Sequence, residues 1–147
     1  MRSDLVYLVQ TDTTVGFVSS DPKLLCAIKM RDPNQKVLQE VDSYSTLLRN
    51  TRVPNRFKKQ VRRACKISLI YPNGLSFRVV DNRSFHHDFI KKFHALYSTS
   101  ANQTSSRYQF DFSYGVSDVV VFNKKGFEEK QSSSILKLNN KKMKRIR

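Results

Sequence analysis

The sequence predicts an α/β (α+β) fold in which a mixed sheet is flanked by helices. Short apolar runs typical of strands alternate along the chain with segments whose apolar residues recur at helical spacing. Glycine and proline number only four each among 147 residues, whereas ten Phe and six Tyr supply bulk for a core. These observations favour a single domain over residues 1–147 with a modest hydrophobic core.

Several apolar segments have the composition of strands. Residues 5–9 form a near-continuous apolar run, which is typical of a buried strand. Residues 67–71 and 75–80 flank Pro72-Asn73-Gly74, a turn sequence that predicts a β-hairpin. Strands are predicted at residues 5–9, 15–18, 37–41, 67–71, 75–80, 95–97, 119–122 and 135–138, with 143–146 as a further candidate.

Four segments carry the signals of helices. Asp21-Pro22 combines an N-cap residue with a proline at the first helical position. Residues 54–64 have the pattern of a basic amphipathic helix with Phe57 and Val61 on its apolar side. The other two helices are predicted from Ser43 through Leu48 and from Ser84 onward, the latter with Phe85, Phe89, Phe93 and Leu96 at helical spacing.

The charge of the chain is strongly positive and unevenly distributed. Lys and Arg number 27 against 12 Asp and Glu, which gives a formal net charge of +15. Residues 43–80 contain nine basic residues and no acidic one, and residues 141–147 add five more basic residues. Such a field favours polyanions such as nucleotides or RNA. A solvated basic surface without a ligand is the alternative interpretation.

The cysteines and the N-terminus bear on redox state and location. Cys26 and Cys65 fit no metal-binding spacing, so buried free thiols are expected, with a disulfide as the alternative. No stretch has the length of a membrane-spanning helix, and the N-terminus lacks the apolar core of a secretory signal. The expectation is a cytoplasmic protein with no membrane contact.

Three polar segments that interrupt apolar elements form the candidate site. Residues 11–14 follow the first strand, residues 29–31 end the first helix, and residues 98–102 follow the strand at 95–97. Loops at strand ends commonly hold ligands, and Lys and Arg suit phosphate and carboxylate oxygens. Each segment alone also fits an ordinary cap or turn. Their conjunction favours a site for a phosphorylated ligand.

Other familiar sites are absent from the sequence. Neither a GxxxxGK[ST] loop nor a GxGxxG motif is present, so a bound nucleotide would not lie in a glycine-rich cradle. No Ser-His-Asp or Cys-His arrangement is recognisable. His86, His87 and His94 are interpreted as surface or structural residues, and no side-chain metal ligand is predicted.

Taken in order, these segments resemble the YrdC-like family of threonylcarbamoyl-AMP synthases, in a short variant. Gln10 stands where proline is usual in that family, Glu40 where many relatives have His, and the usual Pro-Gly-Pro before residue 67 is absent. The matching motifs are Thr11-Asp12-Thr13, Lys29-x-Arg31, Arg78 in a hairpin strand, Ser100-Ala101-Asn102, Ser133-Ser134-Ile135-Leu136 and a terminal Arg147, for which Arg145 is the competing choice.

The resemblance implies a twisted mixed sheet flanked by helices, with a basic concave groove. It also implies an enzyme that makes threonylcarbamoyl-AMP and pyrophosphate from L-threonine, bicarbonate and ATP. The product serves the threonylcarbamoyladenosine modification of tRNA next to the anticodon, through downstream threonylcarbamoyl-transfer proteins. Mg²⁺ would accompany ATP, held mainly by phosphates and water.

The resemblance also implies roles for individual residues. The implied catalytic and nucleotide-binding residues are Lys29, Arg31, Ser100 and Asn102, with Arg147 as a further nucleotide contact. The implied threonine-binding residues are Thr13, Arg78 and Ser133, with Arg78 pairing the carboxylate.

Two alternatives to this activity remain open. The first is a non-catalytic module with the same fold that binds double-stranded RNA or tRNA through its basic face. The second is carbamoyl-phosphate-linked chemistry, as in YrdC-like domains of hydrogenase maturation proteins. It ranks last, because those domains lie in much longer chains with acylphosphatase and zinc-finger parts.

Overall fold

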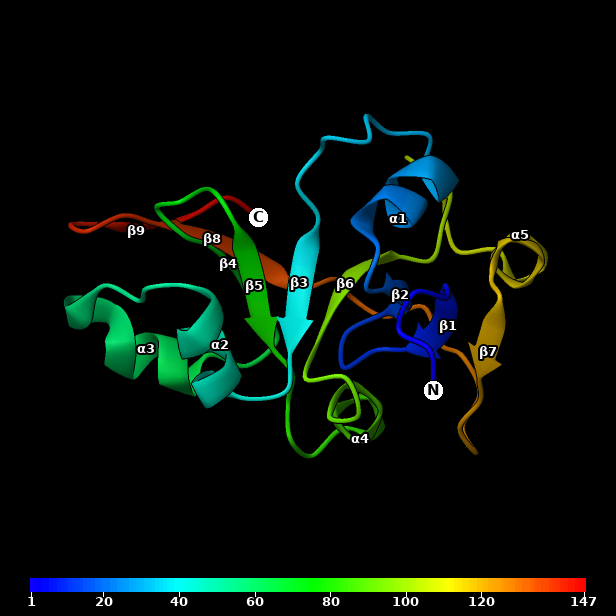
Figure 1. The fold of residues 1–147 in the computed structure, drawn as a ribbon, viewed down its shortest axis with the longest axis horizontal. Coiled ribbons are helices and arrows are strands. Elements are labelled where there is room, and N and C mark those ends of the chain that lie inside the picture. The colour runs from blue at the N-terminus through cyan, green and yellow to red at the C-terminus, as the bar shows by residue number, and fades with distance from the viewer.

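The computed structural model describes residues 1–147 and contains one nine-stranded sheet, in the order β7-β1-β2-β6-β3-β5-β4-β8-β9 (Figure 1). The pairs β1–β7, β3–β5 and β4–β8 are parallel and the remaining pairs are antiparallel. The strands are β1 (Tyr7–Gln10), β2 (Val15–Ser19), β3 (Leu38–Val41), β4 (Ile67–Ile70), β5 (Ser76–Val79), β6 (Ala95–Ser100), β7 (Val119–Val121), β8 (Ser134–Leu138) and β9 (Met143–Arg145).

Short helices pack against this sheet, and the predicted mixed α/β fold class is confirmed. None of them has the length and hydrophobicity needed to cross a bilayer. The helices are α1 (Pro22–Ile28), α2 (Tyr44–Asn50), the 3₁₀ turn η1 (Asn55–Phe57), α3 (Lys58–Arg63), α4 (Phe85–Ile90) and α5 (Phe110–Val116). The predicted caps are present, since the Asp21 side chain accepts from Lys23 N and the Ser43 side chain from Thr46 N.

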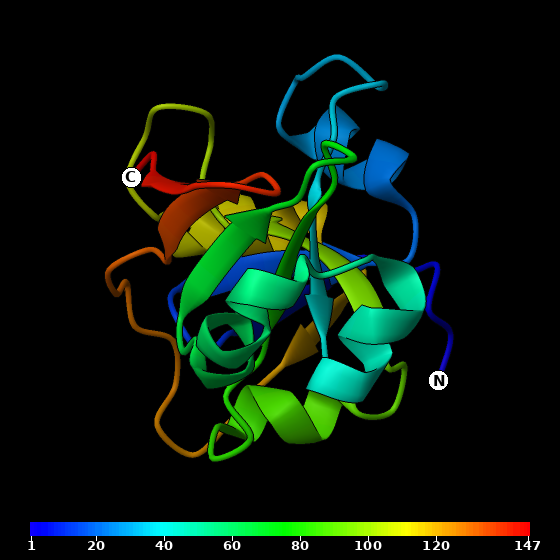
Figure 2. The same cartoon turned by 90° about the vertical axis from the view of Figure 1, so that its left-hand side faces the viewer.

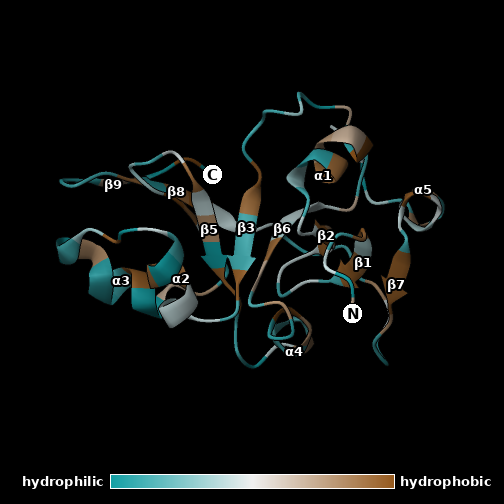
Figure 3. Cartoon of the chain, in the orientation of Figure 1, coloured by the Kyte–Doolittle hydropathy of each residue, from teal (hydrophilic) through white to brown (hydrophobic).

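The two faces of the sheet are covered differently. On one face, Phe17 packs in a cluster with α1 and α5, and Val41 and Phe77 pack in a cluster with α2 and α3. On the other face, Val18 and Leu96 pack against α4. Figure 2 views the molecule from the end that carries α2 and α3. Figure 3 shows β7 as hydrophobic and much of α2 and α3 as hydrophilic. On the second face, the short helix α4 covers only part of the sheet and leaves the remainder open.

The helix predicted from Ser84 is shorter than its apolar spacing suggested. Helix α4 ends at Ile90, and Leu96 lies in β6. His94 has a left-handed φ of 66°, which ends any helical continuation. Phe93 nevertheless packs against Tyr7, with ring centroids 5.9 Å apart. The spacing thus reflects a shared core and not one continuous helix.

Two further expectations need correction. Cys26 is buried, as expected, but Cys65 is exposed, and both are free thiols. Helix α5 was not predicted, because its sequence is rich in aromatic residues and contains Ser113 and Gly115. Ser113 is fully buried and donates to the Ala101 carbonyl oxygen at 2.7 Å, so a tertiary contact holds this helix in place.

Helix α1 ends in a Schellman motif. Met30 N donates to the Ala27 carbonyl oxygen at 3.0 Å and Arg31 N donates to the Cys26 carbonyl oxygen at 2.9 Å. Met30 occupies the left-handed position of this motif, with a φ of 52° and a side chain that is 94% exposed. The motif reverses the chain between Lys29 and Arg31. Lys29 therefore lies at the C-terminal end of α1, and Arg31 lies in the loop that follows.

Replacing Met30 by glycine should stabilise the protein. A left-handed residue with a Cβ costs about 1–2 kcal/mol, of which the entropy lost by glycine offsets about 0.5–1 kcal/mol. We expect Met30→Gly to raise the free energy of unfolding by about 0.5–1 kcal/mol, measured by urea denaturation. Met30→Ala keeps the Cβ and is the matched control. A Met30→Gly protein less stable than Met30→Ala would contradict the assignment.

Candidate functional site

A cavity of about 260 Å³ opens where the second face of the sheet is left uncovered by α4. Small polar side chains of the central strands create it. Ser68, Ser76 and Ser98 line it, while their strand neighbours Leu69, Phe77 and Tyr97 pack in the hydrophobic clusters of the opposite face. The alternation of large apolar and small polar residues therefore produces a polar hollow on one side of a buried sheet.

The cavity brings together segments that are far apart in the chain. The sequence-predicted residues in its lining are Thr13, Arg31, Arg78, Ser100, Ser133 and Arg147. Lys29 and Asn102 lie behind the lining, in contact with Ser100. Arg145 is not part of the lining, and its Nη2 lies 3.5 Å from Ser134 Oγ. Arg147 is thus the one of the two terminal arginines that reaches the cavity.

Lys29 joins the end of α1 to the loop after β6. Its Nζ donates to the Ser100 carbonyl oxygen at 3.1 Å and to Asn102 Oδ1 at 2.9 Å. It also contacts Ser100 Oγ at 3.5 Å and the Asn102 carbonyl oxygen. All four acceptors are neutral oxygens, so the ammonium group is solvated by the protein without a counter-ion.

This arrangement perturbs the titration of Lys29. The residue is only 3% exposed, and burial lowers the pKa of Lys29 to about 8, with a further contribution from the positive charge of Arg31. Neither Lys29 nor Arg31 lies within ion-pairing distance of a carboxylate. Arg31 at the cavity and Lys29 behind its lining are thus two cations without counter-ions, an arrangement that favours an anion.

The loop after β6 is held from several sides. Ala101 is 1% exposed; its N donates to the Val15 carbonyl oxygen at 2.9 Å, and its own carbonyl oxygen accepts from Ser113. Asn102 Oδ1 accepts from Ser100 Oγ as well as from Lys29. These contacts fix the Ser100 hydroxyl and the Lys29 ammonium relative to each other before any ligand binds.

The threonine-rich loop between β1 and β2 forms another wall. Thr11 Oγ1 accepts from Thr13 N at 3.1 Å and donates to the Thr14 carbonyl oxygen. Gly16 permits this close packing, since a Cβ there would lie 2.8 Å from Thr11 Cγ2 and 3.2 Å from the Thr99 carbonyl oxygen. The loop is therefore rigid and buried at the edge of the cavity.

Arg78 lies in a buried ionic network that was not predicted. Its Nη2 donates to Glu40 Oε1 and lies 3.1 Å from Asp12 Oδ1, with side-chain exposure of 5% for Arg78 and 0% for both carboxylates. Two carboxylates thus face one guanidinium group, so their charge more than offsets that of Arg78. Arg78 lines the cavity, and its only side-chain hydrogen bond runs through Nη2, so Nη1 has no hydrogen bond within the protein.

His86 extends the same network toward α4. Its Nε2 lies 2.5 Å from Glu40 Oε2, and it is 1% exposed, so it is a structural histidine, as interpreted from the sequence. Burial by itself raises the pKa of Glu40, but Arg78 and His86 outweigh that effect and hold the pKa well below its usual range. Glu40 therefore stays ionised and fixes Arg78 in place.

The C-terminal side of the cavity is built by β8 and the residues around it. Ser133 is buried and shares a hydrogen bond of 2.7 Å with Ser68 Oγ. Arg147 Nη2 donates to the Ser133 carbonyl oxygen at 3.0 Å, which holds the arginine at the rim. No group of three or more His, Cys, Asp or Glu side chains is placed to hold a metal ion.

Several cavity residues escaped prediction. Ser68 of β4 and Ser76 of β5 could have been found from strict alternation with large apolar residues. Lys36 lies in an irregular loop and carries no comparable signal. Four more lining residues, Thr11, Thr14, Ser98 and Thr99, belong to the predicted polar segments 11–14 and 98–102. The lining residues outside the predicted segments are Val15, Gly16, Lys36, Val37, Leu38, Ser68, Ile70, Ser76, Ser132 and Ile135.

Comparison with known sequences gives no assignment. No protein-family model matches the chain, and no curated protein matches it.

Comparison with solved structures identifies the fold. A double mutant of P. abyssi Sua5 matches with a TM-score of 0.78 at 12% identity, over 97% of this chain and 52% of that one. P. abyssi Sua5 complexed with L-threonine matches with a TM-score of 0.75 at 14% identity, over 97% and 50%. E. coli YciO matches with a TM-score of 0.77 at 13% identity, over 98% and 82%.

The chain thus spans about half the length of Sua5 and most of YciO. The superpositions cover 97% and 98% of the chain. The chain therefore has the YrdC-like fold of Sua5 and YciO, as the resemblance of its motifs implied.

Proposed function

We propose that the protein belongs to the YrdC-like family and makes threonylcarbamoyl-AMP from L-threonine, bicarbonate and ATP, with release of pyrophosphate. The observation that carries the proposal is that Arg31 and Ser100 line one cavity, with Lys29 directly behind Ser100 and no carboxylate within ion-pairing distance of either cation. The fold is that of Sua5, one structure of which is a complex with L-threonine. The product would serve threonylcarbamoylation of tRNA.

The chemistry requires positioned charge more than a nucleophilic side chain. The threonine amine attacks carbon dioxide derived from bicarbonate, and a carbamate oxygen then attacks the α-phosphorus of ATP as pyrophosphate leaves. Negative charge accumulates at the carbamate and at the phosphates during both steps. Preorganised cations and hydroxyl donors stabilise such charge and hold the reactants in line. The cavity contains these groups and no Ser-His-Asp arrangement.

Lys29, Arg31 and the Ser100–Asn102 loop would share the anion. Lys29 Nζ already has its neutral acceptors in place, and its longest contact is the 3.5 Å one to Ser100 Oγ. A phosphate or carbamate oxygen that replaces this hydroxyl would accept a hydrogen bond from the ammonium group. Ser100 Oγ, which donates to Asn102 Oδ1, would donate to the ligand only by exchanging that hydrogen bond. Arg31, exposed at the edge of the cavity, would neutralise the remaining charge.

Threonine would bind at the opposite wall. Thr13 and Ser133 would supply hydroxyl groups there, and Arg78 Nη1 would donate a hydrogen bond to the threonine carboxylate. Because the two carboxylates of Glu40 and Asp12 more than offset the Arg78 charge, this contact would be weaker than a pairing with an isolated arginine.

The size of the cavity limits how much of ATP it encloses. Its volume of about 260 Å³ suits an amino acid and phosphate groups, since pockets for drug-sized ligands typically start at about 300 Å³. The nucleoside would therefore extend past the rim, where Arg147 lies. Mg²⁺ would bind through the phosphates and water, because the protein offers no carboxylate cluster.

Omission of single substrates tests the reaction. Purified protein should release pyrophosphate only when ATP, threonine and bicarbonate are all present, and threonylcarbamoyl-AMP should be detected by mass spectrometry. Pyrophosphate release that does not depend on threonine and bicarbonate would contradict the proposal. Stable nucleic-acid binding with no such turnover would support the non-catalytic alternative.

Removal of either cation should abolish most of the turnover. We expect Lys29→Ala and Arg31→Ala each to lower kcat/KM by about 10²–10³-fold, the usual effect of losing one donor to developing negative charge. Lys23→Ala is the matched control, since Lys23 is an exposed lysine on the same helix. Unchanged turnover in either cavity variant, or equal loss in the control, would overturn the assigned roles.

The lowered pKa of Lys29 predicts a pH dependence of ATP binding. Lys29 binds its proton more weakly in the folded protein than in the unfolded chain, where its pKa is 10.5. Protonated Lys29 therefore destabilises the fold below about pH 8, and this destabilisation disappears as the pH rises toward 10.5. A bound anion would raise the pKa of Lys29 back toward its usual value. ATP affinity should therefore be constant below about pH 8 and decrease above it, with proton uptake on binding.

Isothermal titration calorimetry in buffers of different ionisation enthalpy measures both the ATP affinity and the number of protons taken up on binding. Lys29→Gln removes the titrating group and should bind ATP more weakly, with an affinity that does not change between about pH 7 and pH 9.5. Identical pH profiles for the two proteins would contradict the role of Lys29.

A further inference from the structure

Helix α5 carries apolar side chains on both of its sides. Phe112 and Val116 pack in the hydrophobic cluster that contains Phe17. Phe110 and Tyr114 lie one turn apart on the other side, are 43% and 56% exposed, and belong to none of the hydrophobic clusters. A helix at a protein surface normally directs polar residues outward, so an apolar outer side indicates a surface that a partner covers.

The exposed rings of α5 form one continuous row with two rings of the segment between β7 and β8. The ring centroids of Tyr114 and Phe110 are 5.6 Å apart. The centroid of Phe127 lies 6.3 Å from that of Phe110 and 5.4 Å from that of Phe122, which is 60% exposed. We call these four side chains the aromatic row. Its three most exposed rings present roughly 300 Å² of surface, at about 200 Å² for a whole aromatic side chain, which reaches the size of a functional patch.

The aromatic row adjoins a free edge of the sheet. Strand β7 is the first in the sheet order and pairs only with β1, so its outer edge has no ladder partner. Phe122 directly follows Val121, the last residue of this strand. Apolar surface and unpaired backbone groups are therefore neighbours at this edge.

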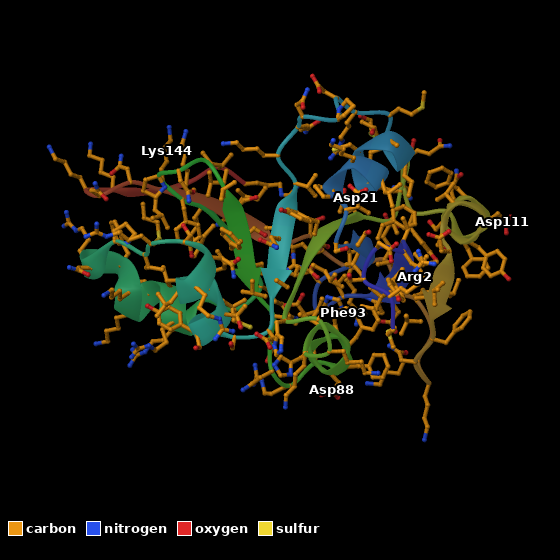
Figure 4. All side chains as sticks on the ribbon, viewed as in Figure 1. Arg2, Asp21, Asp88, Phe93, Asp111 and Lys144 are labelled. Carbon is orange, nitrogen blue, oxygen red and sulfur yellow. The ribbon has the colours of Figure 1, made fainter.

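This end of the molecule is nearly neutral, although the chain as a whole carries a formal net charge of +15. Residues 107–129 contain three basic and four acidic residues, whereas residues 43–80 and 130–147 contain sixteen basic residues and no acidic one. Figure 4 places Asp111 of α5 at one end of the molecule and Lys144 of β9 at the opposite end. The aromatic row therefore lies at the end that is remote from most of the positive charge.

This charge distribution favours a second copy of the chain as the occupant. Two copies that met through their basic segments would repel each other. Two copies that meet through the aromatic row keep those segments at the outer ends of the pair. Because a domain of this length has a radius of gyration of about 15 Å, their separation exceeds the range of about 10 Å that screening allows. Charges of both signs flank the row, Asp111 beside Phe110 and Lys124 beyond Phe122, and a two-fold contact can pair them across the interface.

The total exposed surface of the chain also matches what a dimer contact would remove. The chain exposes 8917 Å², whereas a compact monomer of 17.1 kDa exposes about 7,750 Å². The excess is about 1,200 Å², and an interface of standard size buries about 800 Å² on each partner. A contact centred on the aromatic row would therefore bring the exposed surface of each chain close to the usual value.

Other occupants fit this end less well. An anionic bilayer attracts basic residues beside the apolar ones, and here acidic residues outnumber the basic ones. Stacking of unpaired bases on aromatic rings normally accompanies a positively charged groove, and the local charge does not provide one.

We propose that two copies of the chain associate through the aromatic row and the adjoining edge of β7. A two-fold axis would relate them, so that β7 of one copy lies antiparallel to β7 of the other. None of the four rings lines the cavity of the candidate site, so this contact does not depend on the activity proposed for that cavity.

Matched substitutions of exposed phenylalanines test the contact. Phe122→Glu places a charge in the aromatic row, and Phe85→Glu places the same charge on α4, where Phe85 is 48% exposed and outside the row. Tyr114→Glu is a second variant of the row, on a different element. Analytical ultracentrifugation of the full chain over a wide range of protein concentrations measures the dimer dissociation constant of each protein. Urea denaturation at low protein concentration checks that each variant folds.

The native protein and Phe85→Glu should form dimers with the same dissociation constant. Phe122→Glu and Tyr114→Glu should each raise this constant by about 30-fold or more, the usual effect of losing a central aromatic residue of an interface. Hydrogen exchange of the native protein should slow in residues 110–122 as the protein concentration rises, while exchange in residues 85–90 stays constant. Added salt should change the affinity only slightly, because the basic segments of the two copies do not meet.

Three outcomes would overturn the proposal. A native chain that stays monomeric at every concentration would exclude a second copy, and its binding to phosphatidylserine vesicles would identify a membrane as the occupant instead. Equal dissociation constants for Phe122→Glu and Phe85→Glu would place the dimer contact elsewhere. Concentration-dependent protection confined to segments other than residues 110–122 would exclude the aromatic row as the contact.

Discussion

The candidate site depends on one buried ammonium group that is held by neutral oxygens. Lys29 Nζ contacts Ser100 and Asn102, 71 and 73 residues away in the chain, and no carboxylate balances its charge. A carboxylate in that position would make a stable internal ion pair and leave nothing for a ligand. Carbonyl and hydroxyl oxygens orient the cation and leave its charge available to an anion. The Schellman motif of α1 and the buried Ser113 contact of α5 both serve to keep this arrangement in place.

The two ends of the cavity illustrate opposite ways to hold a cation. Arg78 is fixed by Glu40 and Asp12, and its charge is balanced within the protein. Lys29 is held by neutral oxygens behind Ser100, Arg31 lies exposed in the cavity lining, and no carboxylate balances the charge of either residue. A molecule with a concentrated negative charge would therefore orient with that charge toward Lys29 and Arg31. The charge distribution around the cavity thus determines the orientation that an anionic ligand would adopt.

The sequence predicted most of the fold and most of the cation-bearing side of the site. Strand and helix signals were strong where apolar periodicity and N-cap residues agreed, as at Asp21-Pro22. Helix α5 was missed because its stability comes from Ser113, a tertiary contact that no local pattern encodes. The Glu40–Arg78 pairing was missed for a related reason, since it depends on β3 and β5 being parallel neighbours with these residues in register. Their side chains meet only after the sheet has assembled.

Gly16 shows how narrow the tolerance of this site is. It donates no functional group to the cavity, yet even a methyl group at this position would collide with Thr11 and with the β6 backbone. The wall formed by the threonine-rich loop would then have to shift toward the space where a ligand would bind. A residue that offers no side chain to a ligand can therefore constrain evolution of the site through the space that it leaves to its neighbours.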